Sequence, residues 1–271
     1  MTSLLVEITV AAGDAELVSD ELWSSGATGV EVRDGDPGTA LLIAGYPTAE
    51  AARSVASELA RRHPTRVVEV DDSWADAWRQ YAEPVDVGSL VVVPAWREVA
   101  LPEGRTQISI DPRRCFGGGS HPTTRLMLAE IARRLPAGAS VLDVGTGSGI
   151  LAVAAAVLGA VRVEAIDLDG DAVEVTMANA SRNGVADRVE ASTAGIATLR
   201  RTFDVVLANL TAATLAGLAG ELTAAVGPGG WLLLSGMLAG QWTHVAGRFA
   251  AFTVVGLPEL DGWTGAVLRA G

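Results

Sequence analysis

The chain has 271 residues, of which 49% are hydrophobic and 19% are charged, and this balance excludes a disordered or fibrous protein. Its formal charge of −12, with arginine as its only strongly basic residue, disfavours binding to a phosphate backbone and favours a basic protein partner. The single cysteine, Cys115, excludes an internal disulfide and a cysteine-based zinc site.

No apolar run approaches the roughly 18 residues of a membrane span. The first residues alternate apolar and polar side chains without a charged leader or a cleavage site. We therefore expect a cytoplasmic protein with no membrane partner, no metal and no direct nucleic-acid binding.

The first seventy residues predict a small α+β domain in which two helices alternate with strands. The expected strands are 4–10, 29–33, 40–44 and 66–70, and the expected helices are 14–25 and 48–62. This βαββαβ order is typical of a ferredoxin-like domain. Because residues 1–70 contain no catalytic constellation, we expect them to recognise the substrate.

A short tryptophan-rich segment follows, and we interpret residues 71–84 as a linker helix. Trp74 and Trp78 are four residues apart, which places both on one helical face as packing anchors, and Pro84 ends the helix. Two β segments at 88–93 and 107–111, joined by a turn, then lead to a glycine-rich loop and a helix over 124–135.

From residue 140 the pattern changes to strands that alternate with helices. Strands are expected at 140–144, 162–167, 188–192, 203–208 and 230–235, and helices at 149–158, 171–183 and 212–225. Such alternation predicts a doubly wound, mostly parallel sheet. A helix over 239–249 and strands at 252–255 and 264–268 would add an antiparallel edge hairpin. Residues 85–271 are therefore predicted to form one catalytic α/β domain of Rossmann-like type.

A glycine-rich turn follows the first of these strands. Gly145, Gly147 and Gly149 are spaced G-x-G-x-G, tighter than the G-x-G-x-x-G of dinucleotide sites, and Asp143 precedes them. This arrangement is similar to the first motif of S-adenosylmethionine-dependent methyltransferases. In that class the turn passes under the methionine part of the cofactor, and the acidic residue helps to hold the region around its ammonium group.

Two further polar residues stand at strand ends. Asp167 closes the next strand, where a carboxylate can accept both ribose hydroxyls of a nucleoside. Asn209 closes the strand at 203–208, where we expect it to face the cofactor methyl or the incoming acceptor. Asp169 is interpreted as the N-cap of the following helix.

Taken together, CFGGGSHPTT at 115–124, DVGTGSG at 143–149, Asp167 and VVLANL at 205–210 resemble the PrmA family of ribosomal protein L11 methyltransferases. The resemblance implies that S-adenosylmethionine supplies methyl groups to amino groups, an N-terminal α-amine or lysines, of a large-subunit ribosomal protein. It also implies cofactor contacts at Thr124, Gly145, Asp167 and Asn209, to which we add Phe116. The loop departs from the family's FGTGTHPTT, because Gly118 replaces a threonine.

His121 lies before a proline in this loop, a position more typical of a turn or capping residue than of a general base. Cys115 is interpreted as a small buried hydrophobic residue. Two alternatives remain open: a lysine methyltransferase of another basic protein, such as an electron-transfer flavoprotein subunit, and a non-catalytic module that binds S-adenosylmethionine. A small-molecule or RNA methyltransferase fits the acidity and the additional first domain less well.

Overall fold

The computed structural model describes residues 3–27, 29–46, 48–70, 82–101 and 103–271. The chain divides into two compact units, Met1–Ala82 and Glu83–Gly271. The predicted linker helix, with Trp74 and Trp78, falls mainly on 71–81 and so lies outside the described residues.

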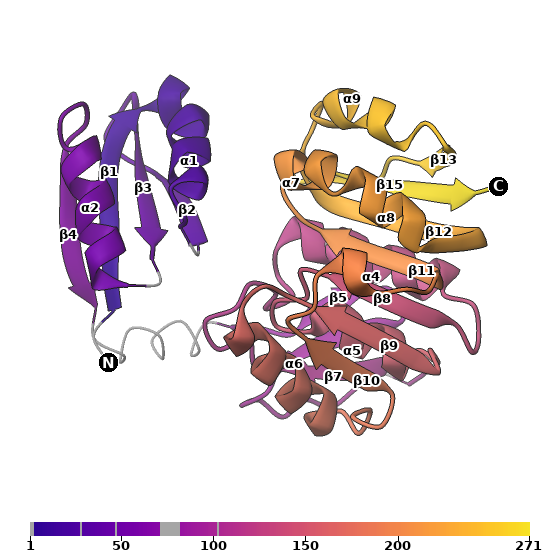
Figure 1. The fold of residues 1–271 in the computed structure, drawn as a ribbon. Coiled ribbons are helices and arrows are strands. Elements are labelled where there is room, and N and C mark those ends of the chain that lie inside the picture. Colours follow the sequence, from indigo (N-terminus) through magenta and orange to yellow (C-terminus); the bar gives the residue numbers. More distant parts are fainter. Residues whose placement is uncertain (1–2, 28, 47, 71–81, 102) are drawn as a thin grey trace. The chain divides into compact units, whose positions relative to one another are not determined.

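The first unit has the predicted βαββαβ order (Figure 1). Its elements are β1 (Ser3–Ala11), α1 (Ala15–Ser24), β2 (Gly29–Asp34), β3 (Thr39–Gly45), α2 (Ala49–Leu59) and β4 (Thr65–Val70). The strands pair antiparallel in the order β2-β3-β1-β4, which is the split-βαβ arrangement of the ferredoxin-like prediction.

Alternation along β1 explains how this unit forms its core. Leu4, Val6, Ile8 and Val10 are buried, because successive side chains of a strand point to opposite faces of the sheet. They join one apolar cluster with residues of α1 and α2. Thr48 begins α2 by accepting a hydrogen bond from the backbone of Ala51 at 3.1 Å.

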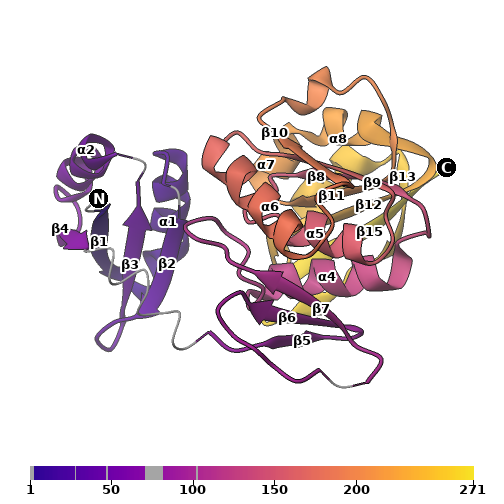
Figure 2. The same ribbon diagram turned by 90° about the horizontal axis from the view of Figure 1, so that it is seen from below.

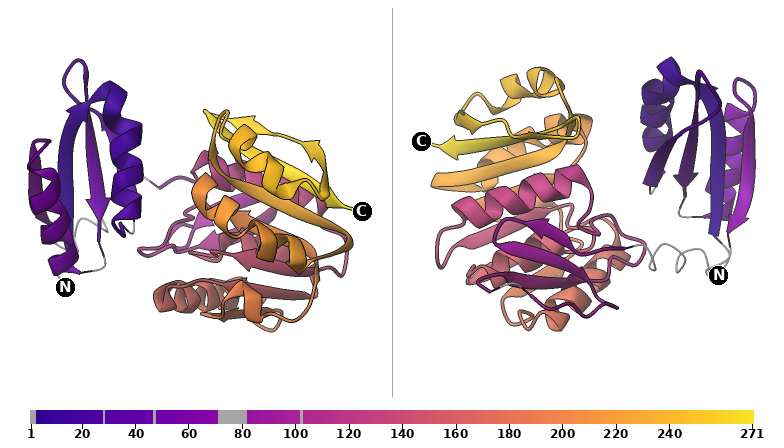
Figure 3. Two further views of the ribbon diagram at one scale, coloured as in Figure 1. Left: turned by 45° about the horizontal axis from the view of Figure 1, so that its top comes forward. Right: turned by 180° about the vertical axis from the view of Figure 1, so that it is seen from behind.

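The second unit is built around a mixed sheet with strand order β10-β9-β8-β11-β12-β15-β13 (Figure 2). The parallel strands and their helices are β8 (Ser140–Val144), α5 (Ile150–Val157), β9 (Arg162–Ile166), α6 (Gly170–Arg182), β10 (Val189–Ser192), β11 (Phe203–Asn209), α7 (Ala212–Gly217), α8 (Ala219–Ala225) and β12 (Val226–Leu238). The predicted antiparallel edge is confirmed, since β15 (Trp263–Ala270) pairs antiparallel with β12, with β13 (Phe252–Gly256) and with the short β14 (Glu259–Leu260). This edge is the yellow end of the sheet in Figure 3.

The central strands are buried on both faces, which is why they read as continuous apolar runs. Val141 and Val205 belong to the core that contains α5 and α4 (Pro122–Arg134). Leu142 and Val206, one residue further along each strand, belong to the core under α7 and α8. The doubly wound sheet is thus covered on both sides.

A separate sheet of β5 (Val85–Val87), β6 (Leu90–Pro94) and β7 (Thr106–Ile110) packs into the α4–α5 core. The two predicted β segments are observed as β6 and β7, and they pair parallel, which the sequence analysis did not predict. Parallel neighbours need a crossover connection, so the chain cannot pass from β6 to β7 by a tight hairpin turn. The short β5, which pairs antiparallel with β6, was not predicted.

Three predicted boundaries also changed in the last third of the chain. The helix expected over 212–225 is divided at Leu218 into α7 and α8, and the helix expected over 239–249 is reduced to α9 (Trp242–Val245) and a 3-10 turn. Strand β12 begins at Val226 instead of residue 230. Its glycine- and proline-rich start, which resembles a loop in sequence, lies at a register shift against β11.

Candidate active site at the carboxyl ends of the parallel strands

The glycine turn joins β8 to α5, as predicted. Gly145, Gly147 and Gly149 have φ angles of +72°, +55° and +77°. Residues other than glycine rarely adopt this left-handed backbone conformation. A Cβ would lie 2.5 Å from Leu210 Cδ2 at the first position, and 2.7 Å from the Phe116 carbonyl oxygen at the second. The backbone conformation therefore favours glycine at all three positions, and at Gly147 the Phe116 backbone also leaves no room for a side chain.

Asp167 lies directly beside this turn, one residue beyond β9. Its Oδ2 accepts a hydrogen bond from the Gly147 backbone at 2.9 Å, and its Oδ1 accepts one from the Asp169 backbone at 3.1 Å. Asp169 is the N-cap of α6, as predicted, and accepts from Asp171 N at 2.9 Å. The structure thus joins two predicted site features that are separated by about 20 residues in the sequence.

Asp143 lies beneath the turn with its side chain fully buried. Its Oδ2 accepts from Thr146 Oγ1 at 2.8 Å, whereas its Oδ1 makes no hydrogen bond of standard geometry among the described residues. The Ala152 backbone N–H still acts on the carboxyl, where it opposes the rise in pKa. Burial, reinforced by the negative charge of Asp167, raises the pKa of the Asp143 carboxyl to about 7. The geometry gives Asp143 a role inside the turn, and its direct contact with a cofactor stays a prediction.

Asn209 is the last residue of β11 and is held by the first turn of α4. Its Nδ2 donates to Thr123 Oγ1 at 3.3 Å, and Thr123 Oγ1 is 2.7 Å from His121 Nδ1. His121 is the N-cap of α4, where Nδ1 also accepts from the Thr123 backbone at 3.3 Å. The interpretation of His121 as a capping residue is confirmed.

Aromatic rings surround His121. The ring centroids of Phe116 and Trp263 lie 5.1 Å and 4.9 Å from that of His121, both in edge-on geometry. Burial among these groups lowers the pKa of His121. Phe116 remains 54% exposed, so its ring can contact a bound molecule.

Thr124 lies in the first turn of α4, and Cys115 lies at the start of the loop before this helix. The Thr124 hydroxyl is fully buried without a hydrogen-bond partner in the described part of the chain. Cys115 is only half-buried, so the prediction that it is a buried residue was partly wrong. Burial, together with the negative charges of three nearby aspartates, raises the pKa of its thiol to about 11. The thiol is therefore protonated and unreactive at neutral pH.

These residues meet where the sheet changes direction. The chain proceeds from β8 outward to β9 and β10, and then returns to β11 on the other side of β8. Ligands of open α/β sheets bind at such a switch point, outside the carboxyl ends of the strands. Gly145, Asp167 and Asn209 follow or end β8, β9 and β11, so all three stand at this position.

The donor and acceptor set at this edge fits S-adenosylmethionine. The Asp167 carboxylate can accept the ribose hydroxyls, and the Thr124 hydroxyl is buried without a hydrogen-bond partner among the described residues. Within the described residues, no group of three or more His, Cys, Asp or Glu side chains is arranged to hold a metal ion.

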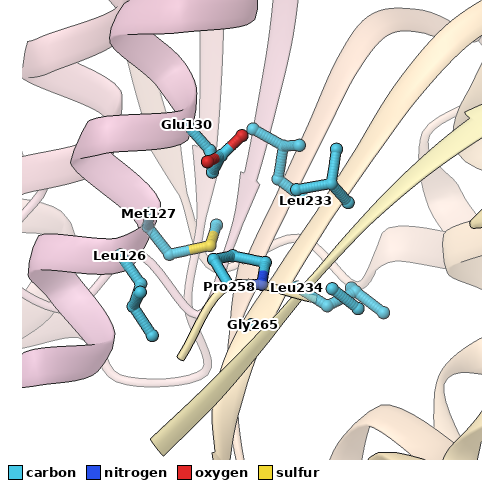
Figure 4. A pocket seen from close by; sticks show the side chains of 9 residues that line it. Leu126, Met127, Glu130, Leu233, Leu234, Pro258 and Gly265 are labelled. Atoms are coloured by element: carbon cyan, nitrogen blue, oxygen red, sulfur yellow. The ribbon is translucent and has the colours of Figure 1, made fainter. Parts of the chain in front are cut away.

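A pocket between α4 and strands β12 and β15 belongs to another part of the fold (Figure 4). Its lining is apolar except for Glu130, whose carboxylate accepts from Arg134 Nε at 2.6 Å. None of the predicted site residues lines it.

In the part of the chain that the structure describes, no helix is long and apolar enough to cross a membrane.

Comparison with known proteins points to one family. The profile described as "Ribosomal protein L11 methyltransferase (PrmA)" matches residues 3–270. A curated ribosomal protein L11 methyltransferase from Myxococcus xanthus is 38% identical over 97% of this chain and 94% of its own length. One from Geobacter sp. strain M21 is 44% identical over 74% of this chain and 68% of its own length.

A solved structure agrees with these sequence matches. The ribosomal protein L11 methylase of Lactobacillus delbrueckii subsp. bulgaricus superimposes with a TM-score of 0.65 and 29% identity. The superposition covers 70% of this chain and the whole of that one.

Proposed function

Because the chain belongs to the ribosomal protein L11 methyltransferase family, we propose that it transfers methyl groups from S-adenosylmethionine to amino groups of ribosomal protein L11. The observation that carries this proposal is the hydrogen bond from Gly147 N to the Asp167 carboxylate. Asn209 stands at the end of β11, the parallel strand on the other side of β8. Cofactor-binding groups and a polar group for the acceptor thereby share one edge of the sheet.

The cofactor would be held mainly by the glycine turn and the strand-end carboxylate. Asp167 would accept the ribose hydroxyls, the turn at Gly145 and Gly147 would lie under the methionine part, and Thr124 and Phe116 would complete the contacts. When bound, S-adenosylmethionine supplies an electrophilic methyl group on a sulfonium.

Asn209 would orient the acceptor amine. Its Nδ2 is engaged by Thr123 Oγ1, which leaves the side-chain carbonyl oxygen to accept a hydrogen bond from a neutral amine. The Thr123 hydroxyl oxygen can receive that N–H while its proton is directed to His121 Nδ1, which also accepts from the Thr123 backbone. A chain of three side chains therefore fixes which way the Asn209 amide faces.

This arrangement gives His121 no role as a general base. Its Nδ1 already accepts from Thr123, so the neutral ring carries its proton on Nε2. The amine would lose its proton to solvent before transfer, which is easier for an α-amine with a pKa of about 7.7 to 8.0 than for a lysine near 10.4. Positioning in line with the S–CH₃ bond then supplies the catalytic advantage.

The first unit would select the acceptor. The first unit, Met1–Ala82, has its own apolar core, and every proposed site residue lies beyond residue 115. The net charge of −12 favours a basic ribosomal protein over RNA as the partner. Such an acceptor would be met in the cytoplasm.

Intact-mass spectrometry of ribosomal proteins tests this function directly. Cells that lack the gene should yield L11 that is lighter by a whole number of methyl groups, and re-expression should restore the mass. Unchanged L11 together with a lighter protein of another kind would favour the alternative of a different basic substrate. No mass change in any protein would favour a non-catalytic binding module.

A further inference from the structure

The loop before α4 crosses directly over the glycine turn, and Ser148 joins the two. The Ser148 backbone donates to the Phe116 carbonyl at 2.9 Å, and its hydroxyl donates to the Gly117 carbonyl at 2.7 Å. The approach is close, because a Cβ on Gly117 would lie 2.6 Å from Ser148 Oγ. The cofactor turn and this loop are therefore packed backbone against backbone.

Ser148 is itself held by a hydrogen bond from a side chain of α6. It is fully buried, and its carbonyl accepts from Asn179 Nδ2 at 2.8 Å. The same buried amide donates to the Asp111 carbonyl and accepts from the Asp111 backbone, both at 3.0 Å. Asn179 thus ties the residue after β7, where the loop segment begins, to the glycine turn that the loop crosses.

The far end of the loop reaches the acceptor side of the site. Thr123 Oγ1 accepts from Asn209, and His121 contacts both Phe116 and Trp263. Between the two ends lie three successive glycines at 117–119, which give the backbone freedom that must be removed when the loop is ordered. The Ser148 bonds fix the first of these glycines.

We infer that Ser148 is a positioning residue: its hydroxyl fixes the loop at Gly117 so that Thr123 and Asn209 present the acceptor amine in line with the methyl group of a cofactor bound on the glycine turn. This inference rests on the proposed function for its catalytic consequence. The contacts that carry it lie within the second unit.

The test is Ser148→Ala in the full chain, with Ser181→Ala as the matched control. Ser181 also donates its hydroxyl to a backbone carbonyl, that of Met177 at 2.9 Å, but it lies exposed on α6 away from the loop. We expect Ser148→Ala to lower kcat for L11 methylation by about 10- to 100-fold, because a misplacement on the order of 1 Å can have that effect. Its Kd for S-adenosylmethionine should change much less than kcat, because Asp167 and the turn glycines are retained and the substitution removes from the turn itself only the bond that the Ser148 hydroxyl accepts from the Ile150 backbone at 3.3 Å.

A second measurement needs no acceptor protein. The chain has three histidines, so the ring resonance of His121 can be assigned by comparison with a His121→Asn variant and titrated by NMR. In the wild-type chain burial lowers the pKa of His121. Ser148→Ala should move that pKa toward its ordinary value as the released loop admits water, and Ser181→Ala should leave it unchanged.

Gly117→Ala provides a variant that perturbs the same contact from the other side. Its added methyl group would lie 2.6 Å from Ser148 Oγ and 3.2 Å from Ile150 Cγ2, at a φ of +105°. Combination with Ser148→Ala removes the first of these contacts, so it should relieve the loss in kcat caused by Gly117→Ala only in part. An unchanged kcat in Ser148→Ala, or equal losses in kcat and cofactor affinity, would overturn the inference. If the wild-type chain methylates no L11, the proposed function fails. The His121 titration then tests the positioning role of Ser148 without the acceptor, and an unchanged pKa of His121 in Ser148→Ala would refute that role.

Discussion

The buried carboxyl of Asp143 predicts an unusual pH dependence of stability. Asp143→Asn replaces a fully buried acid by an amide of nearly the same shape, which can still accept from Thr146 Oγ1. The pKa of the acid is raised from 3.8 to about 7 in the folded chain, chiefly because burial disfavours the charged form. The substitution removes that charge at every pH.

The sign follows from proton binding. Since the folded pKa lies above the unfolded value, the folded state holds an extra proton between about pH 4 and pH 7. The contribution of this group to the free energy of unfolding is therefore greatest below about pH 4, declines as the pH rises toward 7, and is constant above it. A shift of roughly 3 units at 1.36 kcal/mol each sets an upper limit of about 4 kcal/mol.

Urea denaturation of both proteins from pH 4 to pH 8 measures the effect. The stability of Asp143→Asn relative to wild type should rise by up to about 4 kcal/mol across this interval and then level off. Asp204→Asn is the control, because two hydrogen bonds from Ser140 lower the pKa of the Asp204 carboxyl. Between pH 4 and pH 8 the stability of Asp204→Asn relative to wild type should change little, because a carboxyl with a lowered pKa contributes its pH dependence below about pH 4, in the opposite sense. A pH-independent difference for Asp143→Asn would refute the account of the turn interior.

Four further predictions concern the site and the first unit. Asp167→Ala removes the carboxylate that accepts the hydrogen bond from Gly147 N and would accept those of the ribose hydroxyls, so calorimetry should show S-adenosylmethionine binding about 10- to 100-fold more weakly. An unchanged affinity would refute the assignment of Asp167 as a cofactor-binding residue. Asn209→Ala should reduce turnover more than cofactor affinity, and proportional losses in both would leave it as a binding residue only. Thr123→Val keeps the shape of the side chain but frees the Asn209 amide, so kcat should fall while cofactor Kd holds; equal kcat in the variant and wild type would exclude the orienting chain. Removal of residues 1–70 should leave cofactor binding nearly intact and abolish methylation of L11, an expectation that full-rate methylation by the truncated chain would contradict.

Local patterns were sufficient to predict the parallel strands and the residues at their ends. A G-x-G-x-G turn needs positive φ, and an acidic residue at the next strand end reaches it, so Gly147 and Asp167 could be paired from the sequence. Apolar runs likewise marked β8, β9 and β11, because strands buried on both faces carry few polar residues.

Contacts between distant segments were not predictable in the same way. Ser148 lies inside the recognised motif, yet its bond to Gly117 depends on how a loop 31 residues earlier crosses the turn. Thr123 and Asn209, 86 residues apart, meet only because α4 begins beside the end of β11. The parallel pairing of β6 and β7 was missed for a related reason: a Pro/Gly-rich connection suggests a turn, whereas tertiary packing selects a crossover.

The most direct test of the central claim combines the purified chain, S-adenosylmethionine and purified ribosomal protein L11, followed by intact-mass spectrometry. The wild-type chain should add whole methyl increments to L11, and Asp167→Ala should add them far more slowly at a cofactor concentration near the wild-type Kd. L11 that stays unmethylated by the wild-type chain, while the same preparation binds S-adenosylmethionine, would contradict the account.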